Sequence, residues 1–218
     1  MELVRYAEAD LPTTHGPFRL VVYREHVTGG PEVRDDDANA REHMAIVRGD
    51  VAGHENVTTR VHSECWTSEV MGSLKCDCRE QLNAALETIA GEGAGVIVYL
   101  RQEGRGIGLG NKVRAYALQN DGADTVEANL ALGFEADART YDIAGAILAD
   151  LGVKSVRLLT NNPLKVNGLR AAGVVVRDRV SHWVGENQHN TQYLAVKRRK
   201  MGHHPDQLGL RPVRPAKG

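Results

Sequence analysis

The sequence lacks long apolar runs, is poor in aromatic residues and carries almost no net charge. No stretch approaches the roughly 18 consecutive apolar residues of a membrane-spanning helix, and the N-terminus lacks the basic and then apolar segment of a secretory signal. Aromatic residues make up 5% of the chain, and 27 basic side chains nearly balance 28 acidic ones. The chain therefore has neither the aromatic platforms nor the basic excess of a nucleic-acid-binding protein. We expect a cytoplasmic protein without a nucleic-acid or membrane partner.

Cysteine is also scarce, with three residues in 218. They cannot all pair within one chain, and a reducing compartment disfavours disulfides. Cys65, Cys76 and Cys78 do not have the spacing of a structural zinc finger, but three thiolates leave one position open on a tetrahedral ion, as catalytic zinc requires. The alternative is three unrelated buried thiols, and the spacing of the cysteines alone does not decide between this and a metal site. The polar residues next to these cysteines favour a metal site.

A glycine-rich segment follows the apolar run at residues 95–101. Its glycines are Gly104, Gly106, Gly108 and Gly110, and its cations are Arg101, Arg105, Lys112 and Arg114. The order fits neither a P-loop nor a dinucleotide-binding fingerprint. Glycines nevertheless let backbone N–H groups approach an anion, and arginines suit phosphate oxygens. We interpret the segment as a phosphate site, with residues 160–165 at a helix start as a second candidate. An exposed turn with solvated arginines is the alternative.

Strand-like and helix-like patterns alternate along most of the chain. The predicted strands cover residues 17–24, 44–51, 58–63, 95–101, 155–160 and 174–180. The predicted helices run from residue 79 to the glycines at 91–95 and over residues 112–119, 125–132, 141–151 and 163–172. This alternation predicts a single-domain α/β fold, layered α/β/α with a mixed sheet.

Polar segments are expected outside this core. Residues 29–41 are predicted to form an exposed hairpin excursion. The basic run at residues 197–200, on a terminal helix, is typical of a solvated face rather than of a phosphate or partner contact. We place the domain at residues 1–203 and expect residues 204–218 to form a disordered C-terminal tail.

Seven segments, taken in order, closely resemble one enzyme family. They span residues 60–65, 73–78, 101–108, 114–119, 124–129, 159–163 and 200–203. The family is GTP cyclohydrolase II, which opens riboflavin biosynthesis, and the resemblance runs from about residue 3 to residue 203. It implies a zinc-dependent homodimer that uses GTP. Two departures, Gly110 in place of a common leucine and Val196 in place of a common threonine, touch no matched catalytic position.

The resemblance assigns roles residue by residue. Cys65, Cys76 and Cys78 match the family's zinc ligands, so the open position would hold the water that attacks C8 of guanine. The residues that match nucleotide-contacting positions are Arg60, Val61, His62, Ser63, Glu64, Gln81, Glu103, Gly104, Arg105, Thr125, Thr160 and Lys165.

Three further residues match catalytic positions of the family. Asp137 matches a proposed proton acceptor, Arg139 a proposed nucleophile at the α-phosphorus, and Tyr116 a tyrosine of the ring-opening step. A guanidinium is almost never neutral. We therefore interpret Arg139 as a charge clamp on the triphosphate instead.

The implied reaction is the Zn²⁺-dependent hydrolysis of GTP, with Mg²⁺ on the triphosphate. It would release formate and pyrophosphate and give 2,5-diamino-6-ribosylamino-4(3H)-pyrimidinone 5′-phosphate. One alternative is a paralogue of the same fold that stops at the formylamino pyrimidine, against which Tyr116 argues. Another is a non-catalytic guanine-nucleotide sensor with a structural zinc.

Overall fold

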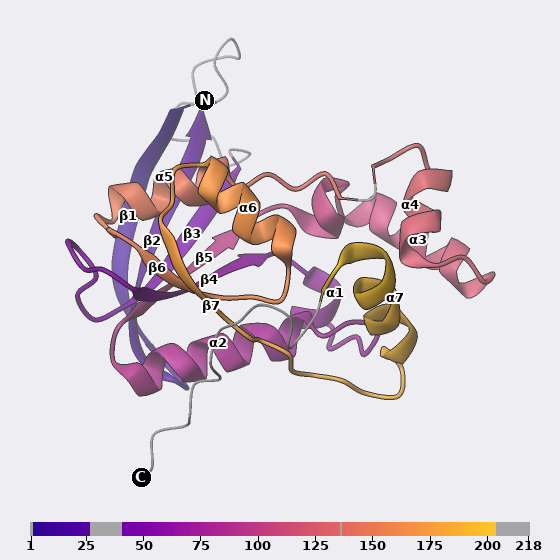
Figure 1. Cartoon of the computed structure of the whole chain (residues 1–218), viewed down its shortest axis with the longest axis horizontal. Coiled ribbons are helices and arrows are strands. Elements are labelled where there is room, and N and C mark those ends of the chain that lie inside the picture. Colours follow the sequence, from indigo (N-terminus) through magenta and orange to yellow (C-terminus); the bar gives the residue numbers. More distant parts are fainter. Residues whose placement is uncertain (1, 27–40, 136, 204–218) are drawn as a thin grey trace.

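The computed structural model describes residues 2–26, 41–135 and 137–203 (Figure 1). The strands are β1 (Glu2–Thr13), β2 (Gly16–His26), β3 (Glu42–Arg48), β4 (Val57–Ser63), β5 (Gly95–Leu100), β6 (Val156–Leu159) and β7 (Val176–Val180). The helices are α1 (Trp66–Glu69), α2 (Cys78–Glu92), α3 (Leu109–Asn120), α4 (Thr125–Ala131), α5 (Asp142–Asp150), α6 (Pro163–Ala171) and α7 (Thr191–Met201), and a 3₁₀ turn forms η1 (Glu103–Gly106).

The strands form one sheet in the order β1-β2-β3-β5-β4-β6-β7. The pairs from β1 to β5 are antiparallel, whereas β5, β4, β6 and β7 are parallel neighbours. The parallel strands therefore end at one edge of the sheet, where Ser63 of β4 pairs with Leu100 of β5. Helices α1, α3, α4 and α7 lie beyond this edge in Figure 1. The carboxyl edge of a parallel sheet is a common place for a binding site.

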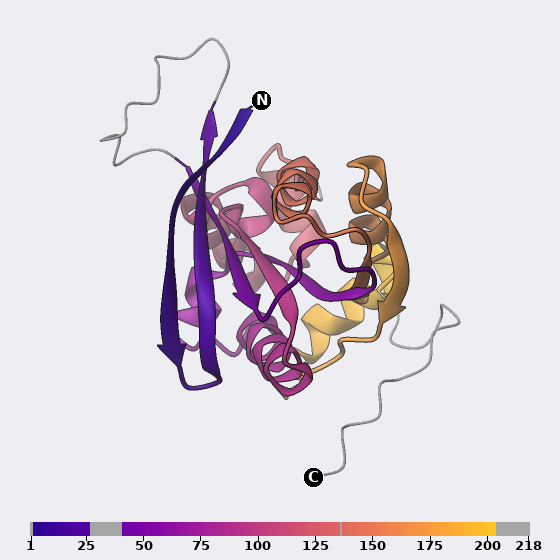
Figure 2. The ribbon, with the colours of Figure 1, turned by 90° about the vertical axis from the view of Figure 1, so that its left-hand side faces the viewer.

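Helices cover the parallel part of the sheet on both faces, as Figure 2 shows. On one face, Ile147 of α5 and Leu169 of α6 share a buried cluster with Val61 and Val98. On the other face, Ile89 of α2 packs in a second cluster. Six of the seven residues of β4 are buried, as expected for a strand that is covered on both sides. The arrangement is α/β/α.

The predicted fold class is confirmed. Each predicted strand and helix overlaps an observed one, and the observed ends differ by a few residues. The expected excursion at residues 29–41 falls outside the described residues except for Arg41, and so does the expected tail at residues 204–218. Across the described ranges, no helix combines the length and apolar character needed to cross a membrane.

Besides the 3₁₀ turn η1, strand β1 and helix α1 had no sequence prediction. Strand β1 pairs with β2, but its residues 4–13 are exposed, so no alternation of buried side chains marks it. Helix α1 has four residues, which is too short for a helical period to show. It follows β4 directly and connects the end of that strand to the cysteine-bearing loop.

Candidate active site

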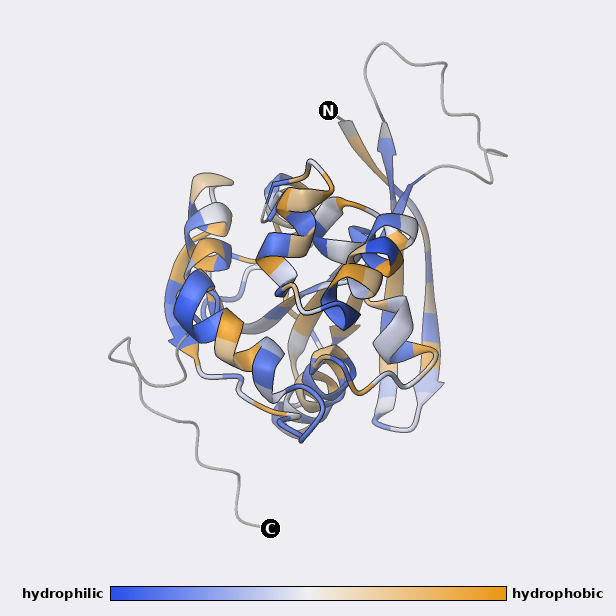
Figure 3. Ribbon diagram, turned by 90° about the vertical axis from the view of Figure 1, so that its right-hand side faces the viewer, coloured by the Kyte–Doolittle hydropathy of each residue, from blue (hydrophilic) through white to orange (hydrophobic). Residues whose placement is uncertain are grey.

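One cavity lies at the carboxyl edge of the sheet and collects nearly all of the predicted site residues. Those that line it are Arg60, His62, Ser63, Glu64, Cys65, Cys76, Cys78, Gln81, Glu103, Gly104, Arg105, Tyr116, Thr125, Arg139, Thr160 and Lys165. Val61 packs in the core instead, and Asp137 reaches the cavity through Arg139. Figure 3 shows the molecule from beyond this edge, where the helices mix hydrophilic and hydrophobic residues along their length.

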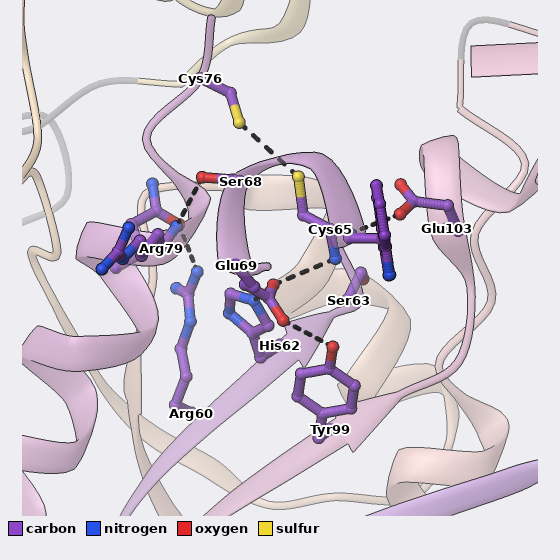
Figure 4. A network of polar contacts seen from close by, with 12 residues as sticks. Arg60, His62, Ser63, Cys65, Ser68, Glu69, Cys76, Arg79, Tyr99 and Glu103 are labelled. Atoms are coloured by element: carbon purple, nitrogen blue, oxygen red, sulfur yellow. Dashed lines mark hydrogen bonds and ion pairs between the residues drawn. The ribbon is translucent and has the colours of Figure 1, made fainter. Parts of the chain in front are cut away.

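The three cysteines meet although they come from different elements. Cys65 caps the N-terminus of α1, Cys76 lies in the following loop, and Cys78 begins α2. Their sulfur atoms all lie within 4.8 Å of one another, and the Cys65 and Cys76 sulfurs are 3.6 Å apart (Figure 4). Two sulfurs on a tetrahedral zinc with bonds of about 2.3 Å are about 3.8 Å apart. We call Cys65, Cys76 and Cys78 the sulfur cluster, and it fits one zinc ion.

Charge is shared unevenly within the sulfur cluster. Hydrogen bonds from the Cys76 and Cys78 thiols lower the pKa of Cys65 far below its usual value, and Lys112, whose Nζ lies 3.1 Å from Sγ, adds to the effect. Contacts with Cys65 in turn raise the pKa of both other thiols. The cluster therefore favours a thiolate at Cys65 over thiolates at Cys76 and Cys78, and a bound cation would favour ionisation of all three sulfurs.

Glu103 ties the glycine-rich turn to the cysteine-bearing segment. Its Oε2 accepts a hydrogen bond from the Trp66 backbone N–H at 2.6 Å, and its Oε1 accepts from Lys112 Nζ at 2.7 Å. Within η1, Gly104 and Arg105 both adopt left-handed backbone conformations, with φ of 63° and 62°. This conformation is uncommon for a residue other than glycine. The predicted phosphate segment is therefore held in a fixed bend beside the sulfur cluster.

Arg60, Lys165 and Arg139 form a second cluster, which we call the cation cluster. Arg60 donates to the Leu159 carbonyl at 2.8 Å and to the side-chain carbonyl of Gln81. Lys165 donates to the Val61 carbonyl at 2.6 Å. Arg60 and Lys165 are 5% and 4% exposed, so these two buried cations are paired with uncharged oxygens.

Burial lowers the pKa of both Arg60 and Lys165. It lowers the pKa of Arg60 to about 10, which still leaves the guanidinium charged at neutral pH. Burial also lowers the pKa of Lys165 well below its usual value, and the charges of Arg60 and Arg139 lower it further. A cavity wall with this excess of positive charge suits an anionic ligand.

Arg139 differs from its neighbours because it has an anionic partner. Its Nε and Nη2 donate to the two carboxylate oxygens of Asp137, at 2.8 and 2.5 Å. Burial disfavours both charges, but this ion pair outweighs it, raising the pKa of Arg139 and lowering that of Asp137. The fork geometry holds the guanidinium in one orientation.

Tyr116 belongs to α3 and contacts the segment that follows Cys65. Its hydroxyl is 3.3 Å from Thr67 Oγ1, and the Lys112 ammonium lies 5.8 Å from its ring centroid. Burial raises the pKa of Tyr116 to about 12, so the phenol is protonated at neutral pH. It can therefore donate a hydrogen bond into the cavity.

The structure also brings in residues that the sequence analysis left out of the site. Lys197, placed on a solvated face by the sequence, is only 9% exposed, and its Nζ donates to Asp77 Oδ1 at 2.6 Å, 120 residues away in the chain. That part of the prediction is wrong, whereas residues 198–200 are exposed. His182 and Tyr193 line the cavity as well. No local motif marks any of these three, because each reaches the cavity through the tertiary fold.

Fold and site together define a class: an α/β protein in which a three-cysteine cluster and a set of buried cations share one cavity at the carboxyl edge of the sheet. A family model described as GTP cyclohydrolase II matches residues 4–181. The GTP cyclohydrolase-2 of Yersinia pseudotuberculosis is 52% identical over 203 residues, which cover 93% of this chain and 98% of that protein. The chain belongs to the GTP cyclohydrolase II family, whose members are enzymes of riboflavin biosynthesis.

Two further relatives agree. The GTP cyclohydrolase-2 of Actinobacillus succinogenes is 51% identical over 203 residues, or 93% of this chain and 88% of that protein. The riboflavin biosynthesis protein RibBA of Nocardia farcinica is 50% identical over 210 residues, which cover 96% of this chain but 48% of that longer protein. The family resemblance read from the seven segments is confirmed.

Proposed function

We propose that this enzyme hydrolyses GTP at C8 of the guanine and releases formate and pyrophosphate, giving 2,5-diamino-6-ribosylamino-4(3H)-pyrimidinone 5′-phosphate. The observation that carries the proposal is the shared cavity. The sulfur cluster offers three soft ligands for a cation, and the cation cluster beside it offers positive charge for phosphates. A nucleoside triphosphate has a base at one end and phosphates at the other, which matches a metal site beside a group of cations.

The sulfur cluster would hold the zinc. Its three sulfurs are spaced for one tetrahedral ion, and three protein ligands leave one position open. When bound, zinc would supply a water of lowered pKa for the attack on C8. Lys112 donates to Cys65 Sγ and would balance part of the negative charge of three thiolates.

The chain's own residues would bind and orient the triphosphate. Arg105 on η1 and Lys165 on α6 would contact phosphate oxygens, and Mg²⁺ would neutralise part of their charge. The ion pair with Asp137 uses Nε and Nη2 of Arg139, and we propose that Nη1 faces the α-phosphate as a charge clamp. Tyr116, protonated at neutral pH, would donate to the opening ring.

The remaining matched residues would complete the nucleotide site. They are Arg60, Val61, His62, Ser63, Glu64, Gln81, Glu103, Gly104, Thr125 and Thr160. Among them, Gln81 joins Arg60 to Asp77 through its side-chain amide, which donates to Asp77 Oδ2 at 2.6 Å. A fixed amide of this kind suits the recognition of a planar base.

We also propose that the protein is a cytoplasmic homodimer. Light scattering of the purified protein checks the oligomeric state.

Incubation of the zinc-loaded protein with GTP and Mg²⁺ tests the proposal. We expect formate and pyrophosphate in equal amounts, and a chelator should abolish formate release. Product mass separates the two reactions, because a product one formyl group heavier would indicate the paralogue that stops early. Attack of Arg139 on the α-phosphorus would expel pyrophosphate and leave a nucleotidyl group on that arginine. Mass spectrometry of the quenched enzyme should therefore show no nucleotidyl adduct if Arg139 is a clamp. Intact GTP after prolonged incubation would contradict the proposal.

A further inference from the structure

Glu69, at the end of α1, contacts three groups around the sulfur cluster with one carboxylate. Its Oε1 accepts from the Cys65 backbone N–H at 3.0 Å and lies 2.8 Å from His62 Nε2. Its Oε2 accepts from the Tyr99 hydroxyl at 2.6 Å. Figure 4 shows the carboxylate between these three partners. Neither the seven family-like segments nor the matched site residues include Glu69.

The three partners belong to elements that meet only through the fold. His62 on β4 and Tyr99 on β5 are register partners in the parallel pair, and their rings stack with centroids 5.6 Å apart. Cys65 follows β4 by two residues and caps α1. The side chain of Glu69 is 12% exposed, so this carboxylate is largely removed from water and its charge is offset by the three contacts.

We infer that Glu69 is a positioning residue for the metal centre: its carboxylate fixes the backbone at Cys65, and so the direction of that sulfur, against the ends of β4 and β5. The inference rests on the proposed zinc site. Cys65 needs such support because α1, which follows it, has a single turn and cannot hold its own N-terminus rigidly. Groups that orient metal ligands without touching the metal set the geometry and affinity of the ion.

The chemistry of the contacts separates position from charge. A glutamine side-chain oxygen can accept from both the Cys65 N–H and His62 Nε2–H, as Oε1 of Glu69 does, and its amide N–H can donate to the Tyr99 oxygen. Glu69→Gln therefore keeps all three contacts without the charge. Glu69→Ala removes all three, and Tyr99→Phe removes one.

Metal affinity and ligand geometry, measured on the full-length protein, test the inference. We expect Glu69→Ala to lower zinc affinity by about 10- to 100-fold in competition with a chromogenic chelator, and to shift the visible absorption bands of the Co²⁺-substituted protein. Glu69→Gln should resemble the parent in both measurements. Glu87→Gln, which removes an exposed carboxylate from α2, is the matched control and should change neither.

Several outcomes would overturn the inference. Unchanged zinc affinity and Co²⁺ bands in folded Glu69→Ala protein would do so, and so would an equal loss in Glu69→Gln, because that result assigns the effect to charge. If circular dichroism shows that Glu69→Ala is unfolded, Tyr99→Phe decides: a smaller loss of affinity supports the inference, and parent-like affinity contradicts it. A parent protein that binds no stoichiometric zinc would instead refute the metal part of the proposed function.

Discussion

The sulfur cluster and the cation cluster share a cavity, but they carry charge of opposite sign and become charged under different conditions. Contacts among the thiols raise the pKa of Cys76 and Cys78, so the sulfur cluster can hold protons until a metal ion replaces them. Arg60 cannot release its proton at neutral pH, and within the described chain its Nε has no hydrogen-bond partner. Negative charge beyond that of Cys65 thus develops when metal binds, whereas the positive charge of Arg60 is present throughout.

The two clusters differ in how they affect the stability of the folded protein when no ligand is bound. A buried cation bonded only to uncharged oxygens destabilises the folded state until an anion arrives. Protonated thiols do not destabilise the folded state in this way, because free cysteine is commonly buried in protein interiors. The cation cluster is therefore expected to favour function at the expense of stability, and the sulfur cluster to be tolerated without its ion.

The largest expected effect breaks the sulfur cluster alone. Cys76→Ser removes one of three zinc ligands, and we expect zinc binding and formate release to be lost while the protein stays folded and still binds GTP. Zinc content, formate yield and calorimetric titration with GTP measure the three properties. Leu74→Ser, at a 52% exposed position in the same loop, is the matched control. An unfolded Cys76→Ser protein would favour a structural zinc instead.

A smaller effect, with two opposite signs, is expected at the cation cluster. Lys165→Met removes a buried amino group that donates to the Val61 carbonyl and whose pKa is lowered by burial. We expect GTP affinity to fall by about 10- to 100-fold, because charged hydrogen bonds contribute about 1.5–3 kcal/mol. The free energy of unfolding should stay equal or rise, since a buried ionisable group bonded to an uncharged oxygen is gone.

Denaturant titration and calorimetry check the two signs of the Lys165→Met prediction. Zinc content should not change, because Lys165 does not contact the sulfurs. Lys154→Met, at an exposed position, is the control and should leave both quantities near the parent values. A loss of stability together with a loss of affinity would show that the ammonium stabilises the fold, and the contrast between the clusters would not hold.

The sequence predicted the residues of the two clusters better than it predicted the residues and elements around them. Alternating strand and helix patterns determine the layers, and motif order brought the cysteines and the arginine-bearing turn into one stretch. Strand β1 was not predicted, because its exposed side chains do not alternate between buried and solvent-facing positions. Lys197 was misread because its partner, Asp77, lies 120 residues away in sequence. Glu69 gave no signal, since three contacts to one carboxylate arise only when β4, β5 and α1 are folded together.

The smallest expected effect tests whether the cation cluster excludes a further positive charge. His182 lines the same cavity, and its Nε2 lies 2.7 Å from the Gln81 carbonyl oxygen. Burial, together with the charge of Arg60, lowers the pKa of His182 from its ordinary value of 6.5 to about 3. Between pH 6.5 and 3 the unfolded state therefore binds a proton that the folded state does not. Stability should fall as pH falls through this window.

His182→Gln keeps a donor for the Gln81 carbonyl but cannot take up a proton. We expect the free energy of unfolding, measured by urea titration from pH 7 to pH 5, to decline less steeply in this variant than in the parent. The difference in slope should approach about 1.4 kcal/mol per pH unit below the ordinary histidine pKa. His189→Gln alters an exposed histidine and should leave the slope unchanged. Parallel slopes for parent and His182→Gln would mean that His182 titrates normally and that the cation cluster tolerates a further charge.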